Sequence, residues 1–403
     1  MTVRRLDILY VGMLPPHPGG SAISWFQVLG GFTRRGHAVR AVAPITEAAL
    51  RGGDEFATSH PEIEVTRFLV PHFYTGPNVP ASEAYRSLER RQIEAALGRL
   101  IAERRPDVIV VGRETFALHV PDVARRHGVP CLLGIRGNTT IAILNGTYPE
   151  AMAQELLAEY RKADLLVSVA EHMARGLAGL GFANVTVIPN AVDLERFAPR
   201  PKDATLLRAL AVPDGHVVVL HASNLKGVKR PLDLVASAAQ AARETPRLVY
   251  VIVGDGTYRG AMEEACRELG VAGQFRFTGW MDYVRIPDLI NLADVVVMPS
   301  ESEGLSRVYL EAQACGRLLL ASDIAPAREV ITDGETGLLF RMGDIADLTA
   351  KTLLAAGDPR LRAAIGRRAR ERVRAHALDD VVAAYEGTME ACRRGDLAGA
   401  LGP

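Results

Sequence analysis

The chain has 403 residues, with 47 lysines and arginines against 47 aspartates and glutamates, so its formal net charge is zero. Charged residues are spread along the whole length, which excludes a broad basic surface for nucleic acid and a disordered acidic tail. The length is sufficient for two hydrophobic cores, and no apolar run approaches the length needed to span a bilayer.

The first segments of the chain are apolar strands. Six short apolar segments occur in residues 1–188, with helical patterns between most of them, near residues 6–11, 38–43, 108–111, 131–135, 165–169 and 185–188. This alternation predicts an N-terminal α/β domain, residues 1–188, built on a doubly wound parallel sheet. Because the chain enters its first strand almost directly, we expect a cytoplasmic protein. Contact with a membrane surface through a local patch stays open, and so does the oligomeric state.

The loop after the first strand contains two adjacent glycines. Gly19 and Gly20, in PPHPGGSAISWF, precede the first predicted helix. Glycines there allow the backbone to approach a ligand at a helix N-terminus. A simple turn would need the same glycines.

Two arginines follow neighbouring strands of the first domain. Arg113 lies in GRET after the strand at 108–111, and Arg136 lies in GIRGNTT after the strand at 131–135, with Asn138 two residues further on. Both arginines are therefore expected at the carboxyl edge of the sheet, where open α/β sheets bind ligands. A guanidinium there would suit a carboxylate or phosphate. The alternative is an ion pair between Arg136 and Glu114 that holds the loop.

Residues 189–202 are predicted to be an interdomain linker, because IPNAVDLERFAPRPK is rich in proline, asparagine and charge. The βα scheme then repeats in a second domain, residues 203–378, with strands near 217–221, 248–253, 275–278, 295–298 and 318–321. A last helix is predicted in the terminal segment, residues 379–403. The four cysteines lack metal-ligand spacing and are expected to be reduced, mostly buried thiols: Cys131, Cys266, Cys315 and Cys392.

The second domain carries basic residues directly after its first strand. In HASNLKGVKRP, Lys226, Lys229 and Arg230 follow the strand at 217–221. A pyrophosphate could lie at this edge, and a solvated basic turn is the alternative. Gly254, in VGDGTYRG, occupies a tight turn after the next strand.

The segment PSESEGLSRVYLEAQACG, residues 299–316, places Glu303 and Glu311 eight residues apart across a loop and the start of a helix. Ser306 is the expected N-cap of that helix and Gly316 its terminator. The positive end of the helix dipole would face an anionic or hydroxyl-rich ligand. Glu311 would accept hydrogen bonds from vicinal hydroxyls such as those of a ribose. Two glutamates at this spacing can also mark no more than a solvated helix face.

This segment, followed by SDIAPAREVITDGETGLLF, resembles the E-x7-E signature of retaining glycosyltransferases of family 4. The resemblance implies the GT-B fold, in which two Rossmann-like domains face one cleft, and a last helix that crosses back to the N-terminal domain. It also aligns Lys229 with a lysine that contacts the donor diphosphate, and Asn224 with a position that is usually arginine. The donor loop is loosely similar to that of enzymes that attach N-acetylglucosamine to malate in bacillithiol synthesis.

The same resemblance implies a nucleotide site in the second domain. Gly254 would form a wall of the nucleotide pocket, and the loop with Gly279 and Trp280 would meet the base. Trp280 could stack there, or it could be a core or surface tryptophan. The expected donor-binding residues are Gly19, Gly20, Asn224, Lys226, Lys229, Arg230, Gly254, Gly279, Trp280, Glu303, Gly304, Leu305, Ser306 and Glu311. On the acceptor side, many relatives carry histidines where this chain has Arg113 and Arg136; these arginines and Asn138 are expected to bind the acceptor.

The resemblance implies a retaining transfer of a hexose or N-acetylhexosamine from a nucleotide-diphosphate sugar to a hydroxyl of a small-molecule or glycan acceptor. No acidic metal-binding motif stands out in the sequence, so the transfer is expected to be metal-independent. We favour UDP as the nucleotide, with GDP as the alternative, and leave open whether the acceptor is acidic. The candidate catalytic residues are Glu303, Lys229 and Arg136, and no metal or other cofactor is expected. Two other functions remain: a nucleotide-sugar epimerase of GT-B architecture and a catalytically silent sugar-nucleotide binder.

Overall fold

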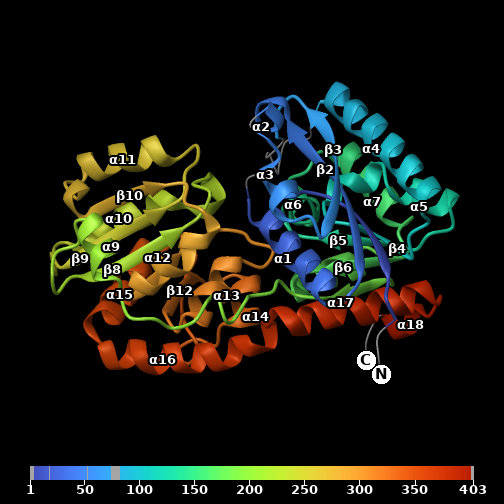
Figure 1. Ribbon diagram of the computed structural model, residues 1–403. Helices are drawn as coiled ribbons and strands as arrows, with labels where there is room; N and C mark the ends of the chain where they lie inside the picture. Colours follow the sequence, from blue (N-terminus) through green and yellow to red (C-terminus); the bar gives the residue numbers. More distant parts are fainter. Residues whose placement is uncertain (1–3, 18, 52, 74–81, 401–403) are drawn as a thin grey trace. The chain divides into compact units, whose positions relative to one another are not determined.

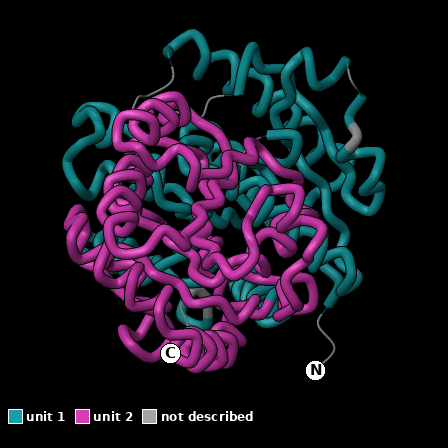
Figure 2. The backbone as a smooth tube through the Cα atoms, turned by 90° about the vertical axis from the view of Figure 1, so that its left-hand side faces the viewer, with its two compact units in different colours: residues 1–191, 378–403 teal, residues 192–377 magenta. Residues whose placement is uncertain are grey.

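The computed structural model describes residues 4–17, 19–51, 53–73 and 82–400. The chain divides into two compact units, coloured separately in Figure 2. Unit 1 comprises residues 1–191 and 378–403, and unit 2 comprises residues 192–377. Most of the segment predicted as a linker therefore belongs to unit 2, and the terminal segment belongs to unit 1.

Unit 1 is built on a seven-stranded parallel sheet with the order β3-β2-β1-β4-β5-β6-β7 (Figure 1). Its strands are β1 (Asp7–Val11), β2 (Ala38–Thr46), β3 (Ile63–Val70), β4 (Val108–Val111), β5 (Cys131–Ile135), β6 (Leu165–Ser168) and β7 (Val185–Val187). The central strands are apolar and buried, as expected for a parallel sheet covered on both faces.

Helices connect the strands of unit 1, as right-handed parallel crossovers require. They are α1 (Gly20–Arg34), α2 (Glu47–Arg51), α3 (Glu55–Ser59), α4 (Glu83–Glu103), η1 (Glu114–Leu118), α5 (Pro121–Arg126), α6 (Asn138–Leu144), α7 (Glu150–Tyr160), α8 (Glu171–Gly179), α17 (Leu378–Arg393) and α18 (Leu397–Ala400).

Unit 2 repeats the architecture with six parallel strands in the order β10-β9-β8-β11-β12-β13. The strands are β8 (Val217–Ala222), β9 (Leu248–Val253), β10 (Phe275–Gly279), β11 (Val295–Met298), β12 (Leu318–Ser322) and β13 (Leu338–Phe340). The helices are α9 (Ala204–Ala209), η2 (Gly227–Lys229), α10 (Pro231–Ala241), α11 (Arg259–Glu268), η3 (Ala272–Gln274), η4 (Tyr283–Arg285), α12 (Ile286–Leu292), α13 (Arg307–Ala314), α14 (Ala325–Val330), α15 (Ile345–Gly357), α16 (Pro359–Arg372) and η5 (Val373–His376).

The predicted fold class, with two Rossmann-like parallel-sheet domains, is confirmed. Every strand predicted from the sequence is present, and the structure adds β3 and β13, one at an edge of each sheet. In both sheets the strand order reverses beside the first strand of the unit. This reversal lies between β1 and β4 in unit 1 and between β8 and β11 in unit 2.

The terminal helix α17 completes the core of unit 1. It lies beside α1 in Figure 1, although more than 340 residues separate the two helices in sequence. Tyr385 of α17 packs on Trp25 of α1 with ring centroids 5.5 Å apart, and Val382 and Met389 are fully buried in the same core. A buried hydrogen bond from His37 Nε2 to Glu386 Oε1, over 2.6 Å, holds another side chain of α17.

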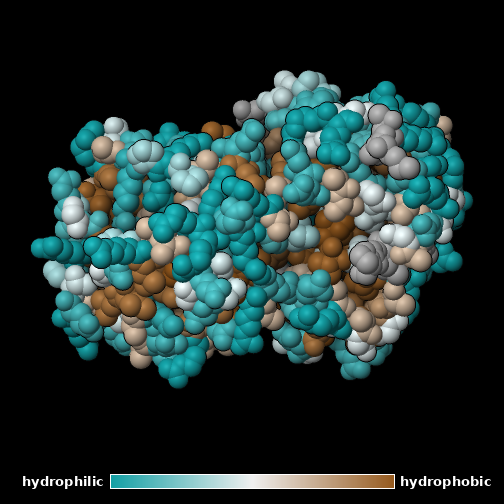
Figure 3. Space-filling model, turned by 90° about the horizontal axis from the view of Figure 1, so that it is seen from below, coloured by the Kyte–Doolittle hydropathy of each residue, from teal (hydrophilic) through white to brown (hydrophobic). Residues whose placement is uncertain are grey.

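The surface agrees with the balanced composition. Figure 3 shows one face of the molecule, where hydrophilic side chains dominate and hydrophobic ones gather in smaller areas between them. Among the described residues, no helix is both long enough and apolar enough to cross a membrane.

Candidate functional site

In unit 2, the loops after β8 and β11 flank the point where the strand order reverses. Open α/β sheets bind ligands at such a point, beyond the carboxyl ends of the strands. The two loops are joined directly, because the backbone N–H of Glu301 donates to the carbonyl of Val228 over 2.8 Å. The residues of unit 2 that are predicted to contact the donor phosphates and sugar lie in these two loops.

Lys229 and Glu303 form an ion pair across this junction. The Lys229 Nζ lies 2.5 Å from the Glu303 Oε1, and the two side chains are only 16% and 9% exposed. The Ser300 hydroxyl donates to the same carboxylate oxygen over 2.8 Å. A mostly buried ammonium and carboxylate are thus held together at the edge of the sheet.

His221 ties the two strands together beneath this pair. Its Nδ1 lies 2.9 Å from the Val297 carbonyl oxygen of β11, so Nδ1 carries the proton, because a carbonyl can only accept. The Nε2 then accepts from the Ser223 hydroxyl over 2.8 Å. Full burial lowers the pKa of His221 to about 4. The neutral imidazole therefore fixes the course of the loop after β8.

Glu311 occupies a second cluster, on α13. Its Oε1 accepts from the Arg307 guanidinium over 2.7 Å and from the Tyr283 hydroxyl over 3.1 Å. Arg307 is four residues earlier on the same helix, which places the two side chains on one helix face. The Glu311 carboxylate is 5% exposed, so α13 presents it in one fixed orientation.

The helix around Glu311 differs slightly from the expectation. Ser306 is at the N-cap position of α13, but its side chain makes no capping hydrogen bond. Ser306 and the neighbouring Gly304 and Leu305 are buried beside Glu303. Gly316 follows the helix with φ +64°, the left-handed conformation expected of a terminator.

Gly254 and Gly279 meet in the structure. The Gly254 N–H donates to the Gly279 carbonyl over 2.9 Å, which joins the loop after β9 to the last residue of β10. A Cβ on Gly254 would lie 2.0 Å from the carbonyl oxygen of Ser223, so only glycine allows the loop after β8 to pass this close. Asn224 follows Ser223 and is half-buried. Trp280, for which the sequence left stacking, core and surface roles open, is 58% exposed.

The basic residues after β8 make different contacts in the structure. The Lys229 backbone N–H donates to the Lys226 carbonyl over 2.9 Å. Burial, together with the charge of Lys229, lowers the pKa of Lys226. Arg230 is directed to Asp233, with Nε–Oδ2 and Nη2–Oδ1 distances of 2.6 and 3.2 Å. Its backbone is left-handed, with φ +47°, where it precedes α10. Arg230 therefore organises the start of α10 rather than the Lys229–Glu303 pair.

In unit 1, Arg136 follows β5 and is half-buried against aromatic residues. Its Nη2 donates to the Asn190 Oδ1 over 2.6 Å, and its guanidinium lies 5.2 Å from the centroid of the Trp25 ring. Arg113, after the adjacent strand β4, lies 3.4 Å from Glu89 and 5.2 Å from the ring centroid of Phe116.

Glu114, offered above as an ion-pair partner of Arg136, supports α6. Its Oε1 accepts from the Thr140 hydroxyl over 2.6 Å and from the backbone N–H groups of Gly137 and Thr140 over 3.2 and 3.3 Å. Asn138 is the exposed first residue of α6.

The predicted glycine loop of unit 1 precedes α1. Gly19 has φ +125° at the N-cap of α1, and Gly20 is the first helical residue; both are exposed. Pro18, in the same loop, is outside the described residues. Within the described parts of the chain, no group of three or more histidine, cysteine, aspartate or glutamate side chains could hold a metal ion.

Sequence reasoning missed four residues of the unit 2 clusters: His221, Tyr283, Ser300 and Arg307. Their i, i+4 spacing in the sequence already indicates that Arg307 and Glu311 can pair on one helix face. Tyr283 gives no such signal, because it is 28 residues from Glu311 and only the fold brings them together.

Comparison with known proteins gives two family matches. The family described as Glycosyltransferase Family 4 matches residues 18–196, and the family described as Glycosyl transferases group 1 matches residues 203–372. The 2-deoxystreptamine N-acetyl-D-glucosaminyltransferase of Streptomyces fradiae is 31% identical over 63% of this chain and 62% of its own length. The D-inositol 3-phosphate glycosyltransferase of Nocardiopsis dassonvillei is 31% identical over 62% of each chain. The chain thus matches somewhat less than two thirds of the length of these relatives.

Solved structures show the same fold. Anabaena Alr3699/HepE in complex with UDP has a TM-score of 0.78 at 20% identity, with 96% of this chain and all of that chain covered. Sucrose-phosphate synthase from Thermosynechococcus elongatus has the same TM-score at 19% identity, with 97% and 99% covered. Together with the glutamates of α13 and its preceding loop, the two family matches show that the chain belongs to the family 4-like glycosyltransferases of the GT-B fold.

Proposed function

We propose that this protein is a retaining, metal-independent glycosyltransferase that moves a hexose or N-acetylhexosamine from a UDP-sugar to an acceptor hydroxyl. The observation that carries the proposal is the pairing of Lys229 with Glu303 at the sheet edge of unit 2, with Glu311 fixed on the following helix. This combination offers a cation for a diphosphate and two oriented carboxylates for hydroxyls.

The roles follow from the chemistry of each group. Glu311 would hold both ribose hydroxyls, and Lys229, with Lys226 of the same loop, would contact the diphosphate. Glu303 would orient the sugar hydroxyls and stabilise positive charge at the anomeric carbon. Hydrogen bonds to charged groups contribute about 1.5–3 kcal/mol each, and preorganised donors contribute more where charge develops in the transition state. Retention would follow a front-face route in which the leaving phosphate accepts the acceptor's proton.

The choice of UDP as the donor nucleotide is supported by the names of similar proteins and solved structures. Anabaena Alr3699/HepE was solved with UDP and with UDP-glucose, and the Streptomyces fradiae relative is named for N-acetylglucosaminyl transfer. These support UDP over GDP and leave glucose and N-acetylglucosamine as the first donors to test. That the protein acts in the cytoplasm stays a prediction.

An acidic acceptor is proposed from unit 1. Arg113 and Arg136 follow adjacent parallel strands, and guanidinium groups bind carboxylate and phosphate in a bidentate manner. The name of the Nocardiopsis dassonvillei relative contains D-inositol 3-phosphate, a phosphorylated compound. Arg136, with Lys229 and Glu303, therefore stays a candidate catalytic residue.

The proposal is tested by calorimetry with UDP and by turnover of UDP-glucose and UDP-N-acetylglucosamine with phosphorylated and neutral polyol acceptors. Glu311→Ala should weaken UDP binding by about 10-fold or more, the range for loss of a hydrogen bond to a charged group. Unchanged UDP affinity would remove the ribose role. Product NMR decides between retention and inversion, and release of an epimer or free sugar without acceptor would indicate an epimerase instead.

Independence from metal is tested in the same assay. We expect Lys229 and Lys226, in the loop after β8, to meet the diphosphate in place of a metal ion, so turnover should survive excess EDTA. Loss of turnover with chelator, restored by magnesium or manganese, would overturn this part of the proposal.

A further inference from the structure

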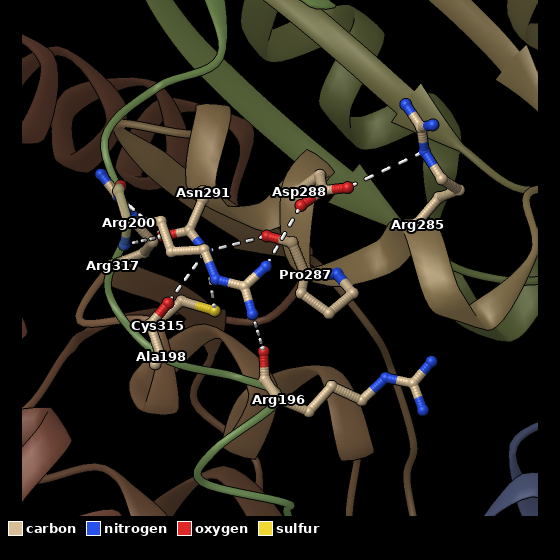
Figure 4. A network of polar contacts seen from close by, with 9 residues as sticks. All are labelled: Arg196, Ala198, Arg200, Arg285, Pro287, Asp288, Asn291, Cys315 and Arg317. Atoms are coloured by element: carbon tan, nitrogen blue, oxygen red, sulfur yellow. Dashed lines mark hydrogen bonds and ion pairs between the residues drawn. The ribbon is translucent and has the colours of Figure 1, made fainter.

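The segment that joins the two sheets, residues 193–202, is fastened to unit 2 by a polar network (Figure 4). Asn291 of α12 lies at its centre: its Nδ2 donates to the carbonyls of Ala198 and Pro287, and its Oδ1 accepts from the Arg200 backbone N–H over 2.9 Å. Arg317 donates to the Asn291 Oδ1 and to the Arg200 carbonyl, both over 2.8 Å. The segment therefore has a fixed course over unit 2.

This course places Arg196 and Phe197 against Tyr283. The Arg196 guanidinium carbon lies 4.7 Å from the centroid of the Tyr283 ring, and the Phe197 ring centroid lies 5.7 Å from it. The Arg307 guanidinium lies 4.6 Å from the same ring. A tyrosine ring that contacts two guanidinium groups gains favourable cation–π energy from each, so its orientation is well defined.

Tyr283 in turn contacts the glutamate proposed to hold the ribose. Its hydroxyl is 3.1 Å from the Glu311 Oε1, and it must donate, because an ionised carboxylate only accepts. Burial and the nearby Glu311 charge raise the pKa of Tyr283, so the phenol keeps the proton that it donates. Together with Arg307, Tyr283 holds the Oε1 of the Glu311 carboxylate.

We infer that Tyr283 is a positioning residue for Glu311 and that Arg196, from the joining segment, holds the Tyr283 ring in place. The inference deepens the proposed function and rests on its ribose role for Glu311. Nucleotide affinity then depends on Tyr283, which lies outside both the basic segment HASNLKGVKRP and the glutamate segment PSESEGLSRVYLEAQACG. It also predicts that the joining segment influences ribose recognition without touching the nucleotide.

The test compares UDP with 2′-deoxy-UDP, since only the first offers both ribose hydroxyls to Glu311. Tyr283→Phe keeps the ring and removes the donor; calorimetry should show UDP affinity about 3- to 10-fold weaker, while 2′-deoxy-UDP affinity changes less than 2-fold. Arg196→Ala should weaken UDP affinity relative to 2′-deoxy-UDP affinity by about 2- to 3-fold. Arg196→Lys should restore part of the loss, because it keeps the charge but not the planar face.

Tyr250→Phe is the matched control. Tyr250 is fully buried in the core of unit 2, and its hydroxyl has no hydrogen-bond partner within the described residues. This variant should leave the affinity for both nucleotides unchanged. Equal weakening of both nucleotides by Tyr283→Phe, or no change in either, would overturn the inference if Glu311→Ala still weakens UDP. If Glu311→Ala has no effect either, the ribose role itself fails.

Discussion

Lys229 and Glu303 must be considered as one pair rather than as two independent contacts. Each side chain neutralises the other at a distance of 2.5 Å, and both are mostly buried. A diphosphate that binds Lys229 would compete with Glu303 for the ammonium. The carboxylate displaced from this contact would then face the sugar hydroxyls, which links binding of the diphosphate to orientation of the sugar.

This competition gives a prediction that separates the two glutamates. Glu303→Gln should leave bare UDP affinity unchanged or tighten it by up to about tenfold, because the ammonium loses its internal counterion, while turnover falls by at least about 100-fold. Lys229→Ala should weaken UDP binding and lower turnover together. Calorimetry with UDP and initial rates with the UDP-sugar measure the two effects. Parallel loss of both properties in Glu303→Gln would mean a loop defect.

Arg136 allows a test of the acidic acceptor. Arg136→Ala should raise the acceptor KM at least about tenfold, as expected for loss of a charge-assisted contact, and leave UDP-sugar affinity within about twofold. Arg136→Lys should rescue only partly, because lysine lacks the bidentate fork. The measurement is a matrix of initial rates with and without added sulfate. A loss of thermal stability without any change in acceptor KM would mean that Arg136 serves only Asn190 and Trp25.

His221 gives a pH dependence with a definite sign. Its pKa is lowered to about 4 by burial, against about 6.5 when exposed. At a pH between these two values, the imidazole is therefore protonated in the unfolded chain and neutral in the folded chain. The stability from the neutral imidazole is fully present above pH 6.5 and is lost as the pH falls toward 4, a difference of about 3 kcal/mol.

Thermal unfolding from pH 7.5 to 4.5 measures this effect. His221→Asn keeps a donor for the Val297 carbonyl but does not titrate in this range. The variant should melt at a lower temperature at pH 7.5 and show a shallower decline toward pH 4.5 than the wild type. An equally steep decline would assign the acid sensitivity to other groups, of which His119, also buried with its pKa lowered to about 4, is the first to examine.

At the scale of elements, a strand could be predicted from the sequence where the chain has a continuous apolar run. The apolar runs of β8, β9 and β11 are buried on both faces, so the three strands could be predicted from the sequence. Because Lys229 follows β8 and Glu303 follows β11, both residues could also be placed at the carboxyl edge of the sheet. The missed strands lie at sheet edges: β3 has mixed burial along its length, and β13 has only three residues. Tyr283 was missed because its role arises from packing and not from spacing.

The contact between α1 and α17 depends on the absence of a side chain. A Cβ on Gly31 would lie 2.4 Å from the Val382 Cγ2, and valine is too stiff at χ1 to move aside. Gly98, inside α4, has nothing within 4 Å of the same point. The two glycines are therefore a matched pair that separates helix propensity from packing.

Gly98→Ala should stabilise unit 1 by about 0.5–1 kcal/mol, because alanine favours the helix and restricts the unfolded chain. Gly31→Ala should destabilise it by about 1–3 kcal/mol, since overpacking outweighs the same gain. Denaturant unfolding of each variant gives the comparison, and Val382→Ala should recover part of the loss in the Gly31→Ala background. Equal effects of the two substitutions would show that α17 does not pack as closely as described.

At the scale of the whole molecule, the two units differ in how the chain builds them. Unit 2 is one continuous stretch, residues 192–377, closed by a backbone bridge between Val192 and Ala377. Unit 1 is discontinuous and needs α17, whose Val382, Tyr385 and Met389 are part of its core. Lys229, Glu303, Glu311 and the contacts that orient them all lie within the continuous unit.

This asymmetry predicts different fates for two fragments. Residues 192–377 expressed alone should fold, melt cooperatively and bind UDP within about 10-fold of the full chain, because the proposed nucleotide contacts are internal to that stretch. Residues 1–191 alone should fail to melt cooperatively and should recover a transition when 378–403 is fused after residue 191 through a flexible linker. Circular dichroism melts and calorimetry with UDP provide the readouts. If the 192–377 fragment folds but does not bind UDP, residues of unit 1 must supply an essential part of the nucleotide site, and the glycine loop at Gly19 and Gly20 would be the first segment to mutate.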